Sequence, residues 1–144
     1  MMTQSKVQVY IHCVWATYQR LPMLTPEIER AVYRCIENEA HRLRCRVLAI
    51  NGMPDHVHLC VKLPSRLDIA RLMNQVKGVA SHFVHQQLPG NEGFAWQEGY
   101  GAFSVGPREV SLAVAYIENQ KDHHASNTLD AEWEATEELY LPRA

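Results

Sequence analysis

The sequence lacks the long apolar run of a membrane protein, since no stretch approaches the roughly 18 consecutive apolar residues that a spanning helix needs. Met1 to Lys6 are polar and lead directly into a strand-like pattern, so we expect no secretory signal peptide. The four cysteines include no C-x-x-C pair, which argues against a zinc site and favours small, reduced core residues. Together these absences predict a cytoplasmic protein.

Motifs for nucleotide binding are also missing. Gly99, Gly101 and Gly106 do not spell G-x-G-x-x-G, because Ser104 occupies the last glycine position of that pattern. The sequence contains no G-x-x-x-x-G-K-[ST] motif either. We therefore expect no nucleotide cofactor.

What is present indicates one folded domain. The chain has 144 residues, of which 47% are apolar and 21% charged, as is typical of globular proteins and unlike disordered ones. The net charge of −2 conceals a mildly basic body over residues 1–121 and an acidic stretch over 122–144. A basic body permits a polyanionic partner, although a mixed solvated surface explains the same charges.

Hydrophobic periodicity predicts the order of the elements. Period-two alternation predicts strands over four ranges: 7–15, 45–51, 56–63 and 100–105. Helical spacing predicts a first helix after the cap formed by Thr25 and Pro26, and a second after a capping box of Ser65 and Asp68. A third helix is predicted over 108–123.

This β-α-β-β-α-β order followed by an extra helix is the ferredoxin-like, or split βαβ, arrangement of the α+β class. We expect the domain to cover residues 1–125 and the rest, 126–144, to be a short acidic tail. Its substantial apolar anchors are Trp133, Leu139 and Tyr140.

Two histidines flank one apolar residue in the third predicted strand. Alternation places His56 and His58 on one face and Val57 on the other, with the histidine backbones about 7 Å apart. Two imidazoles can share a divalent cation if a further ligand comes from elsewhere. Two surface histidines on a half-exposed strand are the other interpretation. The cupin and two-histidine phosphoesterase interpretations fail, because the glutamate or second motif that each requires is absent.

The third predicted helix offers partners for this pair. Tyr116 and Gln120 are four residues apart, so they share one helix face about 6 Å apart along its axis. Tyr116 alternatively belongs to the apolar packing face of that helix, and spacing alone favours this second interpretation.

The conjunction of motifs resembles one family. PDHVHL at 54–59, followed by YIENQ at 116–120, resembles the single-tyrosine transposases of the HUH nuclease superfamily, named for two histidines around a hydrophobic residue. These are insertion-sequence transposases of the IS-two-hundred type and their domesticated relatives that act on repetitive extragenic palindromes. The resemblance covers roughly residues 5–125, with further matches at His12, Trp15, Thr17, Arg20, Lys77 and the NQKDHH run at 119–124.

The resemblance implies a role for each site residue. His56, His58 and Gln120 would hold Mg²⁺ or Mn²⁺, and Tyr116 would be the nucleophile that attacks a DNA phosphate. The products would be a 5′-phosphotyrosine link and a free 3′-OH, so that rejoining needs no ATP. A catalytically retired nucleic-acid-binding module and a metal-dependent phosphodiesterase that uses water are the alternatives.

The resemblance also implies the partners. Family substrates are single-stranded DNA ends folded as hairpins, and family members are homodimers whose tyrosine helix often completes the partner's site. Whether Tyr116 acts in its own chain or across the dimer stays open. Arg20 and Lys77 are candidate DNA-binding residues, as are the neighbouring cations Arg42, Arg44 and Arg46, although simple solvation of isolated cations is the other interpretation. His124 lies four residues beyond Gln120, so an approach to the site is one interpretation, but we expect His123 and His124 to be exposed at a helix end. No membrane partner is expected. The short tail departs from the longer C-terminal segment of relatives.

Overall fold

The computed structural model describes residues 5–136, which include a four-stranded sheet. The strands are β1 (Val9–Ala16), β2 (Arg46–Met53), β3 (His56–Leu63) and β4 (Gly101–Val105). Neighbouring strands are antiparallel in the order β2-β3-β1-β4. Helix α1 (Pro26–Arg42) connects β1 to β2, and α2 (Ile69–Gln87) connects β3 to β4. This topology confirms the predicted ferredoxin-like α+β fold.

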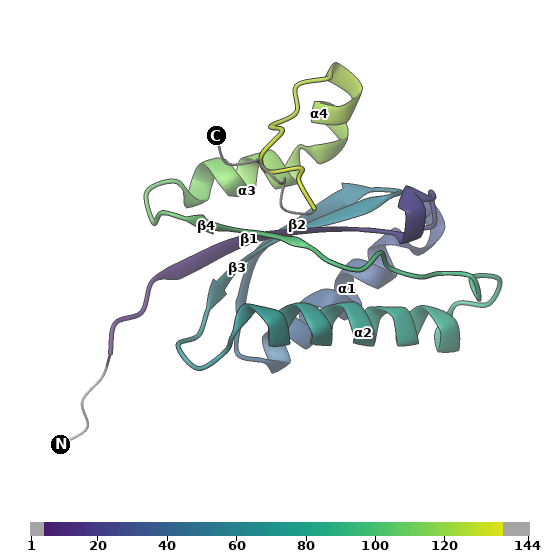
Figure 1. The fold of residues 1–144 in the computed structure, drawn as a ribbon, viewed down its shortest axis with the longest axis horizontal. Coiled ribbons are helices and arrows are strands. Elements are labelled where there is room, and N and C mark those ends of the chain that lie inside the picture. Colours follow the sequence, from purple (N-terminus) through teal and green to yellow (C-terminus); the bar gives the residue numbers. More distant parts are fainter. Residues whose placement is uncertain (1–4, 137–144) are drawn as a thin grey trace, which may run out of the picture.

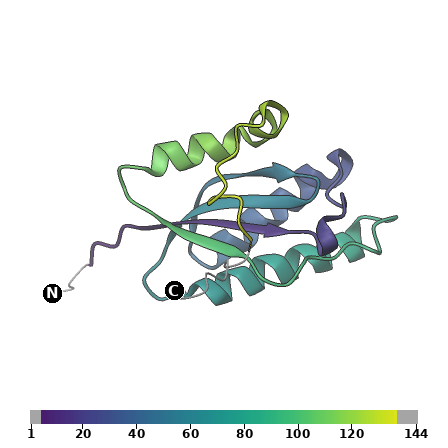
Figure 2. The same ribbon diagram turned by 45° about the horizontal axis from the view of Figure 1, so that its top comes forward.

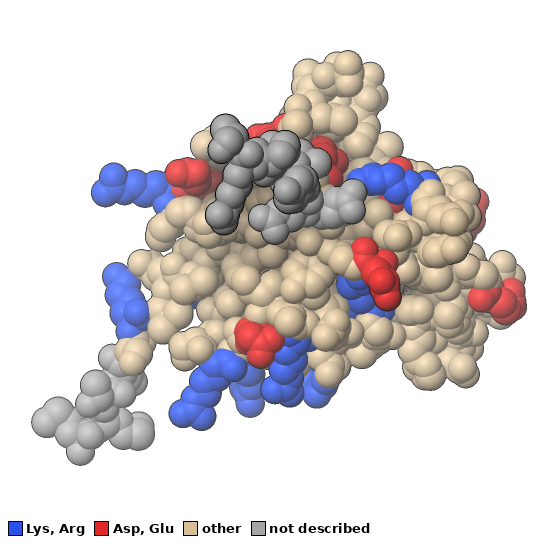
Figure 3. Space-filling view, in the orientation of Figure 1, with Lys and Arg blue, Asp and Glu red and all other residues tan. Residues whose placement is uncertain are grey.

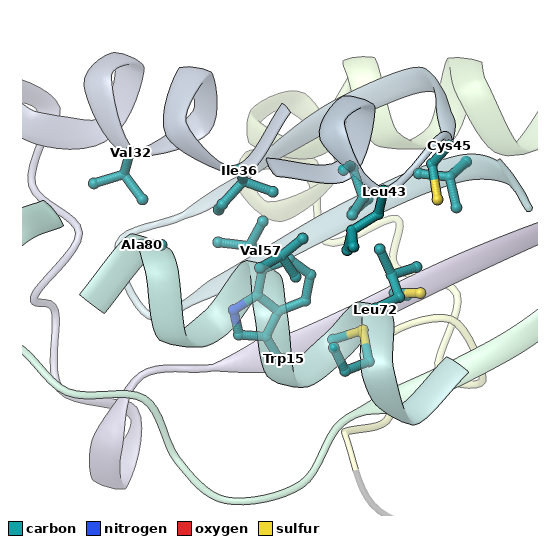
Figure 4. Close-up of a cluster of buried hydrophobic side chains, with 14 of the residues drawn as sticks. Trp15, Val32, Ile36, Leu43, Cys45, Val57, Leu72 and Ala80 are labelled. Atoms are coloured by element: carbon teal, nitrogen blue, oxygen red, sulfur yellow. The ribbon is translucent and has the colours of Figure 1, made fainter. Parts of the chain in front are cut away.

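The helices form layers on both faces of the sheet. Helices α1 and α2 cover one face, whereas α3 (Val110–Glu118) and α4 (Gln120–Ser126) lie over the other (Figures 1 and 2). The main apolar core fills the space between the sheet and the α1–α2 layer, where Trp15, Ile36 and Leu72 pack together (Figure 4). No helix within residues 5–136 has the length and apolar character needed to cross a bilayer.

Alternation along β3 separates this core from a polar face. Val57 and Leu59 belong to the main core, so His56 and His58 point to the opposite side, toward the α3–α4 layer. All four side chains are buried, because helices cover both faces of the strand. The sheet therefore divides an apolar compartment from one that contains imidazoles.

The start of α2 differs from the predicted capping box. Asp68, rather than Ser65, is the N-cap residue: its Oδ1 accepts a hydrogen bond from the Arg71 backbone N–H at 2.7 Å. The carboxylate satisfies an otherwise unpaired amide of the first turn, so the helix begins at Ile69.

The helix predicted over 108–123 is broken in two. Asn119 separates α3 from α4 with φ −99° and ψ 22°, outside the regular helical range. Its side-chain Nδ2 donates to the Ala115 carbonyl at 2.8 Å, the kind of local bond by which asparagine competes with helix continuation. The break gives the residues after Asn119 a new direction.

Candidate active site

Two imidazoles from β3 form the base of the site. His56 and His58 are 2% and 0% exposed, and their ring centroids lie 5.0 Å apart. His56 Nδ1 lies 2.7 Å from Asp55 Oδ1, and His58 Nδ1 lies 2.8 Å from Nε2 of His12 on β1. Because each Nδ1 has its own partner, both Nε2 atoms are left to face the space beneath α4.

Helix α4 supplies two further donor atoms to this space. Gln120 Oε1 lies 3.2 Å from His56 Nε2 and 3.0 Å from His124 Nε2. Gln120 is buried and the His124 side chain is 23% exposed. Four residues apart, they share one helix face. The structure thus brings the three predicted ligand residues together.

Tyr116 on α3 lies next to these groups within the same chain. Its ring centroid is 6.0 Å from that of His58, and it stacks on His123 at 4.6 Å. The Tyr116 hydroxyl donates a hydrogen bond to Glu134 and accepts one from the Asp130 backbone N–H at 3.0 Å. The side chain is 8% exposed, but it packs among polar rings rather than hydrocarbon.

A carboxylate from the segment after α4 lies at the centre of the site. Glu134 Oε1 is 3.1 Å from His56 Nε2 and 3.4 Å from His124 Nε2, and both carboxylate oxygens are 3.2 Å from His58 Nε2. Glu134 Oε2 also accepts from Gln120 Nε2 at 3.1 Å. Tyr116 and the imidazoles therefore meet at one carboxylate.

The electrostatics of these groups are strongly coupled. Burial alone would favour the neutral ring of His56, but hydrogen bonds to Asp55 and Glu134 outweigh it and raise its pKa to about 9. Burial opposes ionisation of Glu134, yet hydrogen bonds from His56 and His58 hold its pKa well below the usual range. Burial, with the Glu134 hydrogen bond, raises the pKa of Tyr116 to about 12. The phenol is therefore neutral near pH 7 in the absence of a cation.

The donor set fits a divalent cation. The site presents imidazole nitrogens, an amide oxygen and carboxylate oxygens. This mixed set of donor atoms can bind Mg²⁺ or Mn²⁺ in octahedral geometry, although it selects for these ions less strongly than an all-oxygen site does. The donor pairs measured above are 3.0–3.4 Å apart. In an octahedron with bonds of about 2.1 Å, neighbouring ligand atoms lie about 3 Å apart. His56, His124 and Glu134 each offer one ligand atom, and these atoms all lie within 4.8 Å of one another, so small adjustments of these three side chains would accommodate one ion.

The two candidate DNA-binding residues lie in different surroundings. Arg20 follows β1, and its guanidinium is 3.8 Å from Asp55, the partner of His56. Lys77 lies on α2, where its ammonium donates to the backbone carbonyls of Gln97 and Gly99 at 2.9 Å each. The structure thus links Arg20 to the site and Lys77 to the loop before β4.

Comparison with known proteins decides the family. Residues 5–120 match the sequence profile described as IS200-like transposase. The chain belongs to the IS200-like transposases. The resemblance inferred from PDHVHL and YIENQ is therefore confirmed at the level of the family.

Two curated relatives of this IS200-like transposase are distant in sequence but align over about three quarters or more of their length. The ISDra2 transposase TnpA of Deinococcus radiodurans is 23% identical over 120 residues, covering 80% of this chain and 86% of the relative. The transposase of insertion sequence IS200 from Salmonella typhimurium is 25% identical over 115 residues, covering 76% and 74%.

Two solved structures share the fold. A Deinococcus radiodurans protein described as a transposase superposes with a TM-score of 0.62 at 24% identity, covering 83% of this chain and 98% of that one. A REP-associated tyrosine transposase bound to a REP hairpin gives a TM-score of 0.62 at 17% identity, covering 86% and 72%.

Sequence reasoning missed part of the transposase site. The expectation that His123 and His124 are exposed was wrong, because His123 stacks on Tyr116 and His124 contacts Gln120, one turn earlier on the same helix. Glu134 was assigned to an acidic tail, and no spacing motif connects it to His56. The one available signal was its neighbour Trp133, an aromatic residue in an otherwise polar segment. Leu139 and Tyr140 lie outside the described residues.

Proposed function

We propose that this IS200-like transposase cuts and rejoins single-stranded DNA through a covalent link to Tyr116. The observation that carries the proposal is the convergence of the Tyr116 hydroxyl and the Nε2 atoms of His56 and His58 on one carboxylate within a single chain. A phenolic oxygen and two potential metal ligands so arranged are within reach of one phosphate group.

The proposed reaction is a transesterification. The Tyr116 oxygen attacks the phosphorus, the P–O3′ bond breaks, and the products are a 5′-phosphotyrosyl link and a DNA 3′-OH. The hydroxyl already donates to Glu134, so this carboxylate is the first acceptor of the phenolic proton. The departing 3′ oxygen takes a proton from solvent. Attack by another 3′-OH on the phosphotyrosine reverses the sequence and joins a new strand.

The proposal includes Mg²⁺ or Mn²⁺ held by His56, His58 and Gln120. When bound, the ion polarises the scissile phosphate and stabilises negative charge on the departing oxygen. Asp55 and His12 fix the orientation of the two imidazoles through their Nδ1 atoms, as outer-shell partners of metal-binding histidines commonly do.

We propose a hairpin-bearing strand as the substrate, which agrees with the REP hairpin bound by one structural neighbour. Lys and Arg side chains gather along the lower side of the molecule in Figure 3, over the α1–α2 layer. A hollow of about 410 Å³ between the end of α1 and the start of α2, in the layer on the opposite face of the sheet from Tyr116, is lined by Arg42, Arg44, Arg66 and Arg71. Such a cluster suits the backbone of a nucleic acid, and Arg20 and Lys77 are further candidates near the loops beside β1 and β4.

The proposal also places a homodimer in the cytoplasm, with residues 1–125 as the catalytic domain and Glu134 added to its site by the segment that follows. Cys13, Cys35, Cys45 and Cys60 are free thiols, as a reducing compartment would maintain. Burial raises the pKa of Cys13 to about 12, which keeps that thiol protonated and inert. Sedimentation of a monomer at micromolar concentration would contradict the dimer.

The test is the incubation of labelled hairpin single strand with protein and Mn²⁺, followed by a denaturing gel. We expect a covalent adduct with the unchanged protein and none with Tyr116→Phe, while binding of the strand stays near normal. Tyr18→Phe, which alters an exposed tyrosine, is the matched control and should form the adduct.

The same gel separates the alternatives. An adduct that persists in Tyr116→Phe would refute the nucleophile. Cleaved product without attached protein would identify a water-dependent phosphodiesterase. Binding of the hairpin strand that needs no metal and gives no covalent adduct would identify a catalytically retired nucleic-acid-binding module.

A further inference from the structure

The segment 130–136, after α4, is fitted into the active site by several independent contacts. The Trp133 ring packs edge-on against His12 at 5.2 Å and against Tyr116 at 5.3 Å between centroids. The carbonyl of Ala135 lies so close to Gly101 of β4 that a Cβ there would be 2.0 Å away. Such close backbone approach requires glycine. The position of Glu134 is thus fixed from both sides.

Residues 121–136 lie beyond the part of the chain that matches the family profile, which ends at residue 120. We propose that Glu134 is a direct ligand of the divalent cation, an anionic donor that this chain supplies from its C-terminal segment. The inference rests on the proposed function and extends the ligand set of His56, His58 and Gln120.

Charge balance supports a carboxylate ligand. The ligands proposed above, two imidazoles and one carboxamide, are neutral when they bind a cation. A divalent ion among buried side chains needs compensating negative charge. Glu134 has its carboxylate within 3.4 Å of three imidazole nitrogens and is itself mostly buried. The nearby carboxylate of Asp55 is directed at the Nδ1 of His56, on the other side of that ring.

The two oxygens of Glu134 have different surroundings. Oε1 faces the Nε2 atoms of His56 and His124, where an ion would be shared. Oε2 accepts hydrogen bonds from Tyr116 and from Gln120 Nε2. A carboxylate bound through Oε1 would therefore hold the nucleophile beside the ion with Oε2. One side chain would connect the metal to the attacking oxygen.

Direct binding of Mn²⁺ to the full-length, DNA-free protein tests the proposal, by calorimetry and by loss of the free-ion electron paramagnetic resonance signal. We expect Glu134→Ala and the isosteric Glu134→Gln to weaken Mn²⁺ binding by at least about tenfold. Glu132→Ala is the matched control, because it removes an exposed carboxylate from the same segment and should leave affinity unchanged. His56→Ala should weaken binding at least as much as Glu134→Ala.

The outcomes distinguish a failure of Glu134 as a ligand from a failure of the ligand set in the proposed function. If Glu134→Ala and Glu134→Gln bind Mn²⁺ as tightly as the unchanged protein or more tightly, while His56→Ala does not, Glu134 only occupies the site and this inference is wrong. If His56→Ala also binds normally, the ligand set of the proposed function is wrong. Anomalous diffraction from a Mn²⁺-soaked crystal should place Glu134 within about 2.2 Å of the ion, and a longer separation would overturn the inference.

Discussion

At the scale of single residues, His12 contacts the proposed ligand His58 without belonging to the ligand set. It is fully buried on β1, and burial lowers its pKa to about 3, so the ring is neutral. If the Nε2 of His58 is to bind a metal, its Nδ1 carries the proton and donates to His12 Nε2. His12 Nδ1–H then has no hydrogen-bond acceptor within residues 5–136. An unsatisfied buried donor typically costs about 1–3 kcal/mol, so we infer that His12 is kept for its effect on His58.

Replacing His12 tests this positioning role. We expect His12→Leu to remain folded but to weaken Mn²⁺ binding about 10–100-fold, because His58 loses the acceptor that fixes its tautomer. The measurement is a Mn²⁺ titration beside a thermal melt. His82→Leu, at an exposed histidine on α2, is the control. Unchanged affinity in His12→Leu would show that His58 is oriented by packing alone.

At the scale of elements, β4 is shaped to receive the segment that contains Glu134. A side chain at Gly101 would also meet Val14 and Phe103 at 2.9 and 3.0 Å, besides the Ala135 carbonyl. Gly78 on α2 differs, because a Cβ there meets no described atom within 4 Å. Close contacts thus require a glycine at position 101, whereas no contact among the described residues requires one at position 78.

Alanine substitutions at these glycines should have opposite effects. Gly101→Ala should destabilise the fold by about 1–3 kcal/mol through overpacking and should displace the segment 130–136. Gly78→Ala should stabilise it by about 0.5–1 kcal/mol, because alanine costs less backbone entropy in a helix. Urea unfolding measures both. Equal effects of the same sign would contradict the packing described here.

Local pattern predicted the regular elements well. The third strand was predicted at its observed bounds, and the first helix starts at Pro26 as its cap indicated. The break at Asn119 was missed, since helical periodicity registers neither the non-helical φ and ψ of one asparagine nor its side-chain hydrogen bond to the Ala115 carbonyl. The ligand triad and Tyr116 were placed by resemblance to a family. Glu134 could not be assigned to the site from the sequence, because it lies 78 positions from its contact His56 and no motif connects the two residues.

At the scale of the whole molecule, one chain contains every group of the proposed site. Tyr116 is bound to the same carboxylate as its own His56 and His58, so the chain needs no residue from a second copy to assemble the site. We therefore predict that Tyr116 acts in its own chain, the alternative of cis or trans placement that the sequence left open. A dimer, if formed, would contain two self-sufficient sites.

Mixing two inactive variants tests this arrangement. We expect an equimolar mixture of Tyr116→Phe and His56→Ala to give no more DNA adduct than either variant alone, because neither chain holds both groups. The measurement is the covalent adduct on a denaturing gel after co-refolding, with each variant alone as reference. Recovery of adduct in the mixture would mean that α3 crosses to the partner chain in solution.

The sheet that separates core from imidazoles has an evolutionary consequence. Val57 and Leu59 face the interior on which folding depends, whereas His56 and His58 face the opposite compartment, which serves the chemistry. A single codon change on the second side can end strand cutting while descendants of the gene still inherit a folded scaffold. We therefore expect substitutions at Val57 and Leu59 to act first on the stability of the fold, and substitutions at His56 and His58 to act first on the proposed chemistry.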